Sequence, residues 1–207
     1  DGPSAAGKST IAKILAKELG YAHLDTGAMY RCVGYYSKLH HVDQKDEDAL
    51  VAMMKEMEIA FDSDGHVFIN QEDVSTEIRQ NDISMMASNV SAFPKVRAHL
   101  VNLQQKIAAN KGYILDGRDI GTVVLPDAEI KIFMVASVEA RAKRRYKEYL
   151  DKQIEADYDV IYKDIETRDY QDTHRATSPL KKAEDALEID TSAMSIDEVV
   201  IAIQSYI

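Results

Sequence analysis

The first ten residues, DGPSAAGKST, constrain this chain more than any other segment. Gly2, Gly7, Lys8 and Ser9 follow the spacing G-x-x-x-x-G-K-S, the pattern of a phosphate-binding loop, or P-loop. Such a loop works because its backbone N–H groups point at the phosphates, while the helix that follows adds the positive end of its dipole. Residues 9–19 carry apolar side chains at helical spacing. The pattern therefore predicts a site for a nucleoside triphosphate, with Lys8 on its β- and γ-phosphates and the Ser9 hydroxyl on Mg²⁺.

Composition limits the classes of partner. The net charge of −10 argues against a long polyanion such as a nucleic acid, whereas a small anionic substrate needs only a few local arginines. No apolar run approaches the roughly 18 residues that a membrane helix needs, so we expect neither a membrane span nor a membrane partner. The single cysteine, Cys32, excludes an intrachain disulfide and a cysteine-rich metal site, and it favours a reducing, cytoplasmic setting.

Helix-like and strand-like segments alternate along the chain, which predicts an α/β fold with a parallel sheet and helices on both faces. A small β-hairpin around Asp64-Gly65 interrupts this rhythm and is interpreted as an insertion. SIDE (195–198) is a capping-box sequence, and Ser137 can cap a further helix. We expect strands at 21–25, 113–116, 130–135 and near 186–190, and helices at 9–19 and from residues 26, 46, 94, 137 and 195.

The loop alone does not distinguish a kinase from other nucleotide-binding proteins. A GTPase would need a guanine-reading Asn-Lys-x-Asp stretch, which is absent, and a motor would need a longer chain. A small kinase needs a second anion site for its acceptor, and the remaining arginines suit that role because phosphoryl transfer is mainly positioning and charge neutralisation. Two alternatives stay open: a kinase for another small acceptor such as shikimate, and a regulatory module that binds nucleotide without turnover.

Five motifs in order carry a resemblance to a known family: GPSAAGKST, LDTGAMYR, SNVSAFPKVR, LDGRDIGTVVLPDA and RDYQDTHRATSPL. Together they resemble the bacterial cytidylate kinases, within the P-loop nucleoside monophosphate kinases. The resemblance implies a central parallel sheet flanked by helices, a small β-containing insert and a helical lid. It implies a core domain of 1–35 and 93–207, with a lid at about 141–175, and a CMP-binding domain of 36–92 with its insert at about 59–92. It also implies a sheet strand of several residues ahead of Asp1.

The resemblance implies a role for each matching residue. ATP would be bound by the loop and two lid arginines: Gly2, Pro3, Ser4, Ala5, Ala6, Gly7, Lys8, Ser9, Thr10, Arg141 and Arg145. Arg31 and Arg118 would bind the acceptor phosphate, Ser88, Arg97 and Asp119 would read the cytosine, and Thr26 would supply a hydroxyl. Arg168 and Asp172 would contact the ribose, and Arg175 would reach the phosphates. Lys8, Arg118 and Arg175 would be catalytic, and the protein would be a monomer that uses Mg²⁺, ATP and CMP or dCMP.

The chemistry of the base agrees with these assignments. Cytosine offers an N4 amino donor, for which a carboxylate such as Asp119 is the natural acceptor. Its N3 and O2 atoms accept, which suits the fork of an arginine. Arg168, Asp172 and Arg175 are four and three residues apart, so they would share one face of a helix. A surface ion pair or a solvated helix face remains the alternative interpretation for each of these charged residues.

Overall fold

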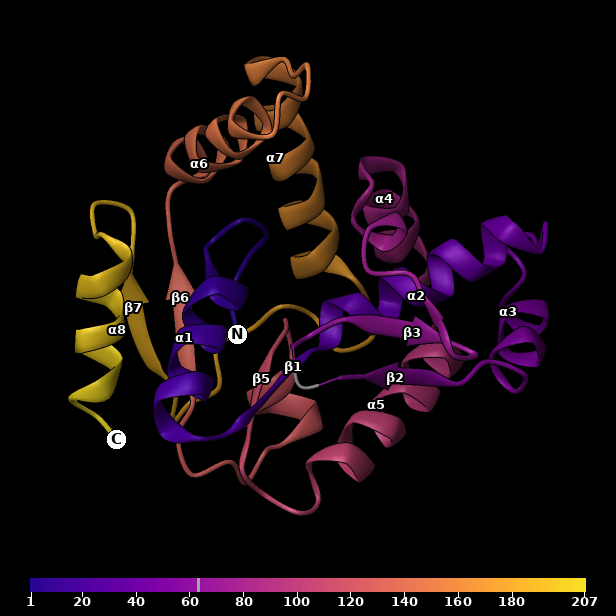
Figure 1. Cartoon of the computed structure of the whole chain (residues 1–207), viewed down its shortest axis with the longest axis horizontal. Helices are drawn as coiled ribbons and strands as arrows, with labels where there is room; N and C mark the ends of the chain where they lie inside the picture. Colours follow the sequence, from indigo (N-terminus) through magenta and orange to yellow (C-terminus); the bar gives the residue numbers. More distant parts are fainter. Residues whose placement is uncertain (63) are drawn as a thin grey trace. The chain divides into compact units, whose positions relative to one another are not determined.

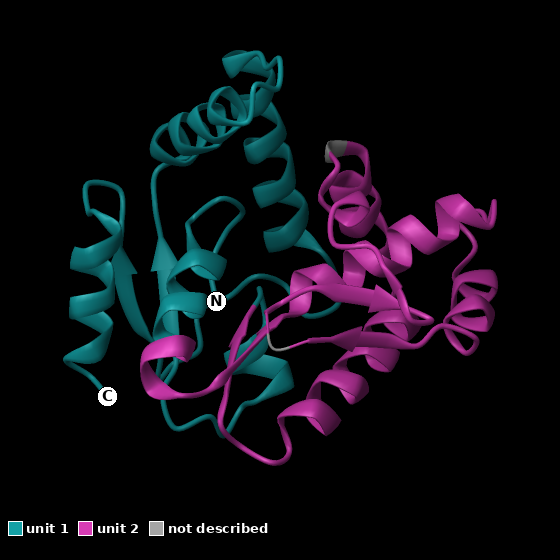
Figure 2. Ribbon diagram, viewed as in Figure 1, with its two compact units in different colours: residues 1–15, 117–207 teal, residues 16–116 magenta. Residues whose placement is uncertain are grey.

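A computed structural model describes residues 1–62 and 64–207. For Asn81 it describes the backbone but not the side chain. The chain divides into two compact units, one of residues 1–15 and 117–207 and the other of residues 16–116, shown in separate colours in Figure 2. The boundaries of these units differ from those of the predicted domains. The units are compact regions of the chain, whereas the predicted domains were defined by their functions. The predicted functional domains therefore stay a prediction. Each helix in the described part of the chain is too short or too polar to span a membrane.

The first unit, residues 1–15 and 117–207, contains a short parallel sheet of β6 (Ile132–Val135) and β7 (Leu187–Asp190), in register from Ile132 opposite Leu187 to Val135 opposite Asp190. The backbone of Asp1 donates to the Ile132 carbonyl at 2.7 Å and accepts from the Met134 amide at 2.8 Å, so the chain enters the P-loop beside β6. The other elements of this unit are the first turns of α1 (Lys8–Leu19), the π-helix η2 (Ile120–Val124), α6 (Val138–Asp151), α7 (Tyr158–His174) and α8 (Ile196–Gln204).

Helices α6 and α7 pack against each other, as Figure 1 shows, and their contact includes a small apolar cluster. Ala142 of α6 meets Ile161 and Ile165 of α7 in a small buried cluster, and Ala5 of the P-loop packs against the same cluster. The caps agree with the sequence: the Ser137 hydroxyl accepts from Ala140 at the start of α6, and Ser195 and Glu198 form the expected capping box of α8. The α6–α7 pair is the element predicted as the lid.

The second unit, residues 16–116, is built around a larger apolar core. Parallel strands β1 (Ala22–Asp25) and β5 (Tyr113–Asp116) pair with Asp25 opposite Asp116. The insert is an antiparallel sheet of β2 (Ile59–Phe61), β3 (Val67–Ile69) and β4 (Glu72–Asp73), which confirms the predicted hairpin, although Ser63 in its connection lies outside the described residues. Its helical elements are α2 (Thr26–Leu39), α3 (Glu47–Met54), the 3-10 turn η1 (Glu77–Arg79), α4 (Asn81–Val90) and α5 (Pro94–Ala108).

Helix α4 was missed by the sequence analysis, which included residues 81–90 in the stretch around the hairpin. It packs closely on α2, and a glycine makes this approach possible. A Cβ on Gly34 of α2 would lie 3.0 Å from the Met86 Cβ and 3.2 Å from the Ala87 amide nitrogen. Val33, Ile83 and Val90, all fully buried, fill this contact and continue into the core of the unit.

Candidate active site

The P-loop has the backbone geometry that its sequence demands. Gly2 has φ +148°, and a Cβ there would lie 2.1 Å from the carbonyl oxygen of Met134, so no other residue fits. Gly7 has φ +88°, and a Cβ there would meet nothing within 4 Å, which leaves open space beside the loop. Ala5 also has positive φ, at +58°, in a region that residues with a Cβ rarely adopt. This strained loop leads directly into α1 at Lys8.

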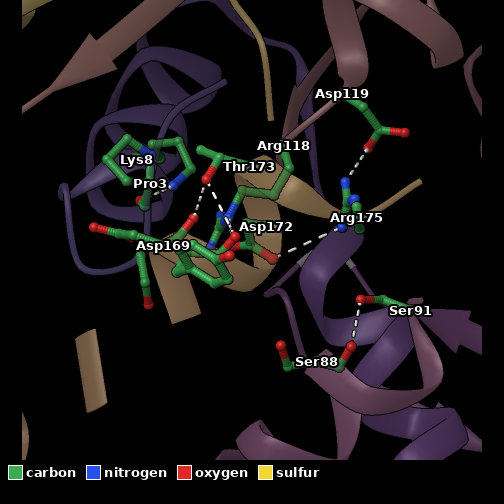
Figure 3. Close-up of polar contacts among 12 residues, drawn as sticks. Pro3, Lys8, Ser88, Ser91, Arg118, Asp119, Asp169, Asp172, Thr173 and Arg175 are labelled. Atoms are coloured by element: carbon green, nitrogen blue, oxygen red, sulfur yellow. Dashed lines mark hydrogen bonds and ion pairs between the residues drawn. The ribbon is translucent and has the colours of Figure 1, made fainter. Parts of the chain in front are cut away.

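Lys8 folds back over the loop. Its Nζ atom donates to the Pro3 carbonyl at 2.6 Å, and the residue is only 8% exposed (Figure 3). The ammonium is therefore held on the loop that carries it, at the N-terminal end of a helix, where an anion is favoured. Ser9 stands next to it in the first turn of α1 and supplies an oxygen of the kind that Mg²⁺ prefers.

Arginines and carboxylates alternate in a second cluster of the same unit. Arg118 donates through Nε to the Asp172 carboxylate at 2.7 Å, while Arg175 lies 3.7 Å from Asp172 and 3.8 Å from Asp119 (Figure 3). Arg175 also donates to the Ser178 carbonyl at 2.6 Å. Because Arg175 is the C-cap of α7, with extended backbone, it reaches Asp172 from beyond the helix rather than from the helical face that the spacing predicted.

The arginines of this cluster change the pKa of the Asp172 carboxyl. Burial acts to raise the pKa of its carboxyl, but the charge and hydrogen bond of Arg118 and the charges of Arg175 and Arg168 outweigh burial, so the pKa lies below its ordinary value. Asp172 is thus held ionised between arginines. An anion that approaches Arg118 and Arg175 meets guanidinium groups whose positions are already set by carboxylates.

Asp1 was assigned no role from the sequence, although its side chain helps to hold the loop that bears Arg118 and Asp119. Its two carboxylate oxygens accept from the amides of Ile120 at 2.9 Å and Gly121 at 2.8 Å. These amides belong to η2, which begins directly after Asp119. No local signal in the sequence could have revealed this contact, because more than a hundred residues separate its partners.

The two predicted lid arginines differ in their surroundings. Arg141 is 3% exposed and contacts the protein through all three of its guanidinium nitrogens. Arg145 is partly exposed and lies over the ring of Tyr149, with 5.8 Å between its Cζ atom and the ring centroid. Arg168, on α7, is partly buried. The predicted ATP contacts of Arg141 and Arg145 stay predictions.

In the second unit, the predicted site residues Thr26 and Arg31 follow the carboxyl end of β1, in α2. Thr26 is buried and donates its hydroxyl to the backbone carbonyl of Asp116 at 2.8 Å. Arg31 donates to the Asp25 carboxylate at 2.7 Å, and Asp25 also caps α2 by accepting from the Ala28 amide. The ends of parallel strands are a common position for ligand sites in α/β proteins.

The predicted base-reading pair of this unit is connected through Ser91. The carbonyl of Ser88 accepts from the Ser91 hydroxyl at 2.8 Å (Figure 3), and the carbonyl of Ser91 accepts from Nη1 of Arg97 at 3.2 Å. Arg97 is 2% exposed, and its Cζ atom lies 5.2 Å from the centroid of the Tyr30 ring. The predicted site residues are therefore divided between the two units.

Three residues of the insert form a group of another kind. Asp62, Asp64 and His66 are exposed, and their potential metal-ligand atoms lie within 4.8 Å of one another. His66 hydrogen-bonds Asp62 at 2.7 Å, which lowers the pKa of the Asp62 carboxyl and raises the pKa of the His66 imidazole. His66 and Asp62 therefore already have each other as hydrogen-bond partners on the surface.

Comparisons with known proteins show which family this chain resembles. The family model described as cytidylate kinase matches residues 1–207. Proteins named cytidylate kinase are 52% identical in Streptococcus agalactiae serotype III (strain NEM316) and 53% identical in Streptococcus pyogenes serotype M5 (strain Manfredo), each over 99% of this chain and 92% of its own length. A solved structure of an uncharacterized protein from Eubacterium ventriosum ATCC 27560 is similar in fold, with a TM-score of 0.51 and 13% identity over 99% of this chain and 93% of its own. This chain belongs to the cytidylate kinase family.

Proposed function

We propose that the protein transfers the γ-phosphate of ATP to CMP or dCMP and so forms CDP or dCDP together with ADP. The observation that carries the proposal is that a P-loop and a cluster of partly buried arginines held by carboxylates occur in one unit of a chain from this family. The loop suits the donor, and the arginines suit the charge that spreads over oxygen atoms during phosphoryl transfer.

Residues 2–10 bind the donor in this proposal. The amides of the loop and the positive end of α1 receive the phosphates, and Lys8 exchanges its bond with the Pro3 carbonyl for one with a phosphate oxygen. The Ser9 hydroxyl would hold Mg²⁺, which supplies charge neutralisation and orients the phosphates when it is bound. Arg145, on the exposed side of α6, contributes a further contact with ATP.

The acceptor phosphate needs cations rather than a general base, because a phosphate monoester is already a nucleophile at neutral pH. Arg31 and Arg118 bind this group, and Arg175 neutralises charge in the transfer together with Lys8. Asp172 and Arg168 contact the ribose. Since Asp172 is held ionised by its arginines, it can accept a hydrogen bond from a ribose hydroxyl throughout the neutral pH range.

The arrangement of hydrogen-bond donors and acceptors distinguishes cytosine from uracil in this proposal. Asp119 accepts from the N4 amino group of cytosine, and Ser88 and Arg97 complete the recognition, with Thr26 as a further polar contact. Uracil has a carbonyl at position 4 and would leave the Asp119 carboxylate facing an acceptor. A site built on hydrogen bonds discriminates strongly against a ligand that leaves its polar groups unpaired.

The proposed reaction is tested by release of ADP from Mg·ATP with CMP, dCMP, UMP, AMP, GMP or shikimate as acceptor. We expect rapid turnover with CMP and dCMP and little with the others. Preference for another acceptor would keep phosphoryl transfer but contradict the roles of Ser88, Arg97 and Asp119. Binding of CMP without any product would instead favour a regulatory module. We further propose that the enzyme acts in the cytoplasm as a monomer, with no nucleic-acid or membrane partner, since its charge is strongly negative and its one thiol is buried and free.

A further inference from the structure

Arg141 is a buried cation that connects three separate segments of the first unit. Its Nε atom donates to the Ala136 carbonyl at 2.9 Å, just ahead of α6, and Nη1 donates to the Ser4 carbonyl of the P-loop at 3.0 Å. Nη2 forms an ion pair with Asp169 of α7 at 2.5 Å. A buried charge is stable only when it is paired, so Asp169 is the group that allows Arg141 to stay in this position.

The hydrogen bond from Arg141 to the Ser4 carbonyl also affects the neighbouring amide of the P-loop. A peptide unit is planar and trans, so the carbonyl of Ser4 and the amide N–H of Ala5 belong to one rigid plane and point in opposite directions. When Arg141 holds the carbonyl, it also sets the direction of the Ala5 N–H, one of the loop amides that can donate to a phosphate.

The peptide that Arg141 holds is followed by the strained residue of the loop. Ala5 has φ +58°, a conformation that costs a residue with a Cβ about 1 kcal/mol and persists only when its surroundings enforce it. Two kinds of contact enforce it here: Arg141 on the Ser4 carbonyl, and the packing of the Ala5 side chain against the apolar cluster between α6 and α7.

We propose that Arg141 and Asp169 are positioning residues that couple the α6–α7 pair to the P-loop and hold its Ser4–Ala5 peptide ready for the phosphates of the donor nucleotide. This role goes beyond the proposed reaction, and it differs from the direct contact with ATP predicted for Arg141. In this proposal Asp169 acts only through Arg141, and both residues affect the donor nucleotide rather than CMP.

The two roles of Arg141 predict different effects for Asp169→Asn. If Arg141 acts through the loop, loss of the carboxylate loosens the loop and weakens nucleotide binding. If Arg141 contacts ATP directly, loss of its protein partner leaves the guanidinium available and does not weaken binding. Glu139→Gln is the matched control, because Glu139 pairs with Lys143 on the exposed face of α6 at 2.6 Å.

The experiment measures the Kd of Mg·ADP and of CMP by calorimetry for the wild type, Arg141→Lys, Asp169→Asn, the double variant and the control. A lost hydrogen bond to a charged group typically corresponds to a tenfold change or more, so we expect each single variant to raise the Kd of Mg·ADP about tenfold. The double variant should be no weaker than the weaker single variant, because both changes remove one coupled interaction. The Kd of CMP should change less than about twofold, and Glu139→Gln should match the wild type.

Amide hydrogen exchange of residues 2–9 without nucleotide provides a readout that depends on neither turnover nor ligand. Exchange should be faster in Arg141→Lys and Asp169→Asn than in the wild type and the control. The proposal is overturned if Asp169→Asn leaves both this exchange and the Kd of Mg·ADP unchanged. Should Arg141→Lys fail to fold, as judged by thermal unfolding, Asp169→Asn alone decides the outcome. None of these results depends on which acceptor the enzyme prefers.

Discussion

The two units hold their predicted site residues by different physical means. In the unit of residues 1–15 and 117–207, arginines are paired with carboxylates, as in partly buried Arg118 with Asp172 and buried Arg141 with Asp169. In the unit of residues 16–116, Arg97 lies over the ring of Tyr30 and donates to a backbone carbonyl, next to a large apolar core. The comparison teaches that substitutions of charged residues in the first unit should act on activity and on the pH dependence of stability, and core substitutions in the second should act on stability at every pH.

The largest effect is expected for Lys8→Ala, in the charged unit. Loss of a positioned cation at the transferring phosphates should lower kcat about 10³-fold while the fold stays intact, because Lys8 has its role in the transition state. Steady-state kinetics with saturating CMP measures the loss. Lys13→Ala, an exposed lysine on α1, is the control and should retain wild-type kcat. A kcat within a few-fold of the wild type in Lys8→Ala would contradict the assigned role.

Leu100→Ala tests the apolar unit. Leu100 is fully buried in the core of residues 16–116, so removal of its side chain should lower the free energy of unfolding by about 3 kcal/mol. Denaturant unfolding measures this loss, and the kcat of the molecules that remain folded should stay near that of the wild type. Leu150→Ala, at an exposed position of α6, should cost far less. The contrast between the units would be contradicted if Leu100→Ala lowered the kcat of the folded protein but left the free energy of unfolding unchanged.

Asp119→Asn is expected to weaken the recognition of cytosine. The amide keeps the size of the carboxylate but loses its charge and replaces one acceptor oxygen with a donor, so kcat/KM for CMP should fall about 100-fold. The KM for ATP should change little, because the donor is bound by residues 2–10. Measured kcat/KM values for CMP and UMP decide the matter: an unchanged value for CMP would remove Asp119 from base recognition.

The smallest effect is a difference in acid stability. The pKa of the Asp172 carboxyl lies below its ordinary value of 3.8, so its pairing stabilises the folded state above that pH and is lost as the pH falls through the lower pKa of the folded protein. At neutral pH, Asp172→Asn should lower the free energy of unfolding by about 2 kcal/mol. This difference from the wild type should shrink below about pH 4.

Denaturant unfolding between pH 7 and pH 3 measures that difference. Glu166→Gln, an exposed position on the same helix, serves as the control and should follow the wild type throughout. A difference between Asp172→Asn and the wild type that stays constant over the whole range would show that the charge of Asp172 does not contribute to stability.

Local patterns were sufficient to predict most of the elements. The helix after the P-loop, the hairpin of the insert and the capping box at Ser195 are encoded within a few residues, and the structure has all three. Helix α4 was missed although Ile83, Met86, Ala87 and Val90 recur at helical spacing, because the whole stretch was interpreted as part of the hairpin insert.

The sequence by itself determined the P-loop, the α/β class and, through its five motifs, the family. Only the tertiary structure decided which charged groups meet. Asp1 holds the amides after Asp119, Arg118 pairs with Asp172, and Arg141 is buried between Ser4 and Asp169. The physical reason is distance along the chain. Helical spacing and capping act over one or two turns, whereas the partner of a buried charge is chosen by packing between segments that can lie more than a hundred residues apart.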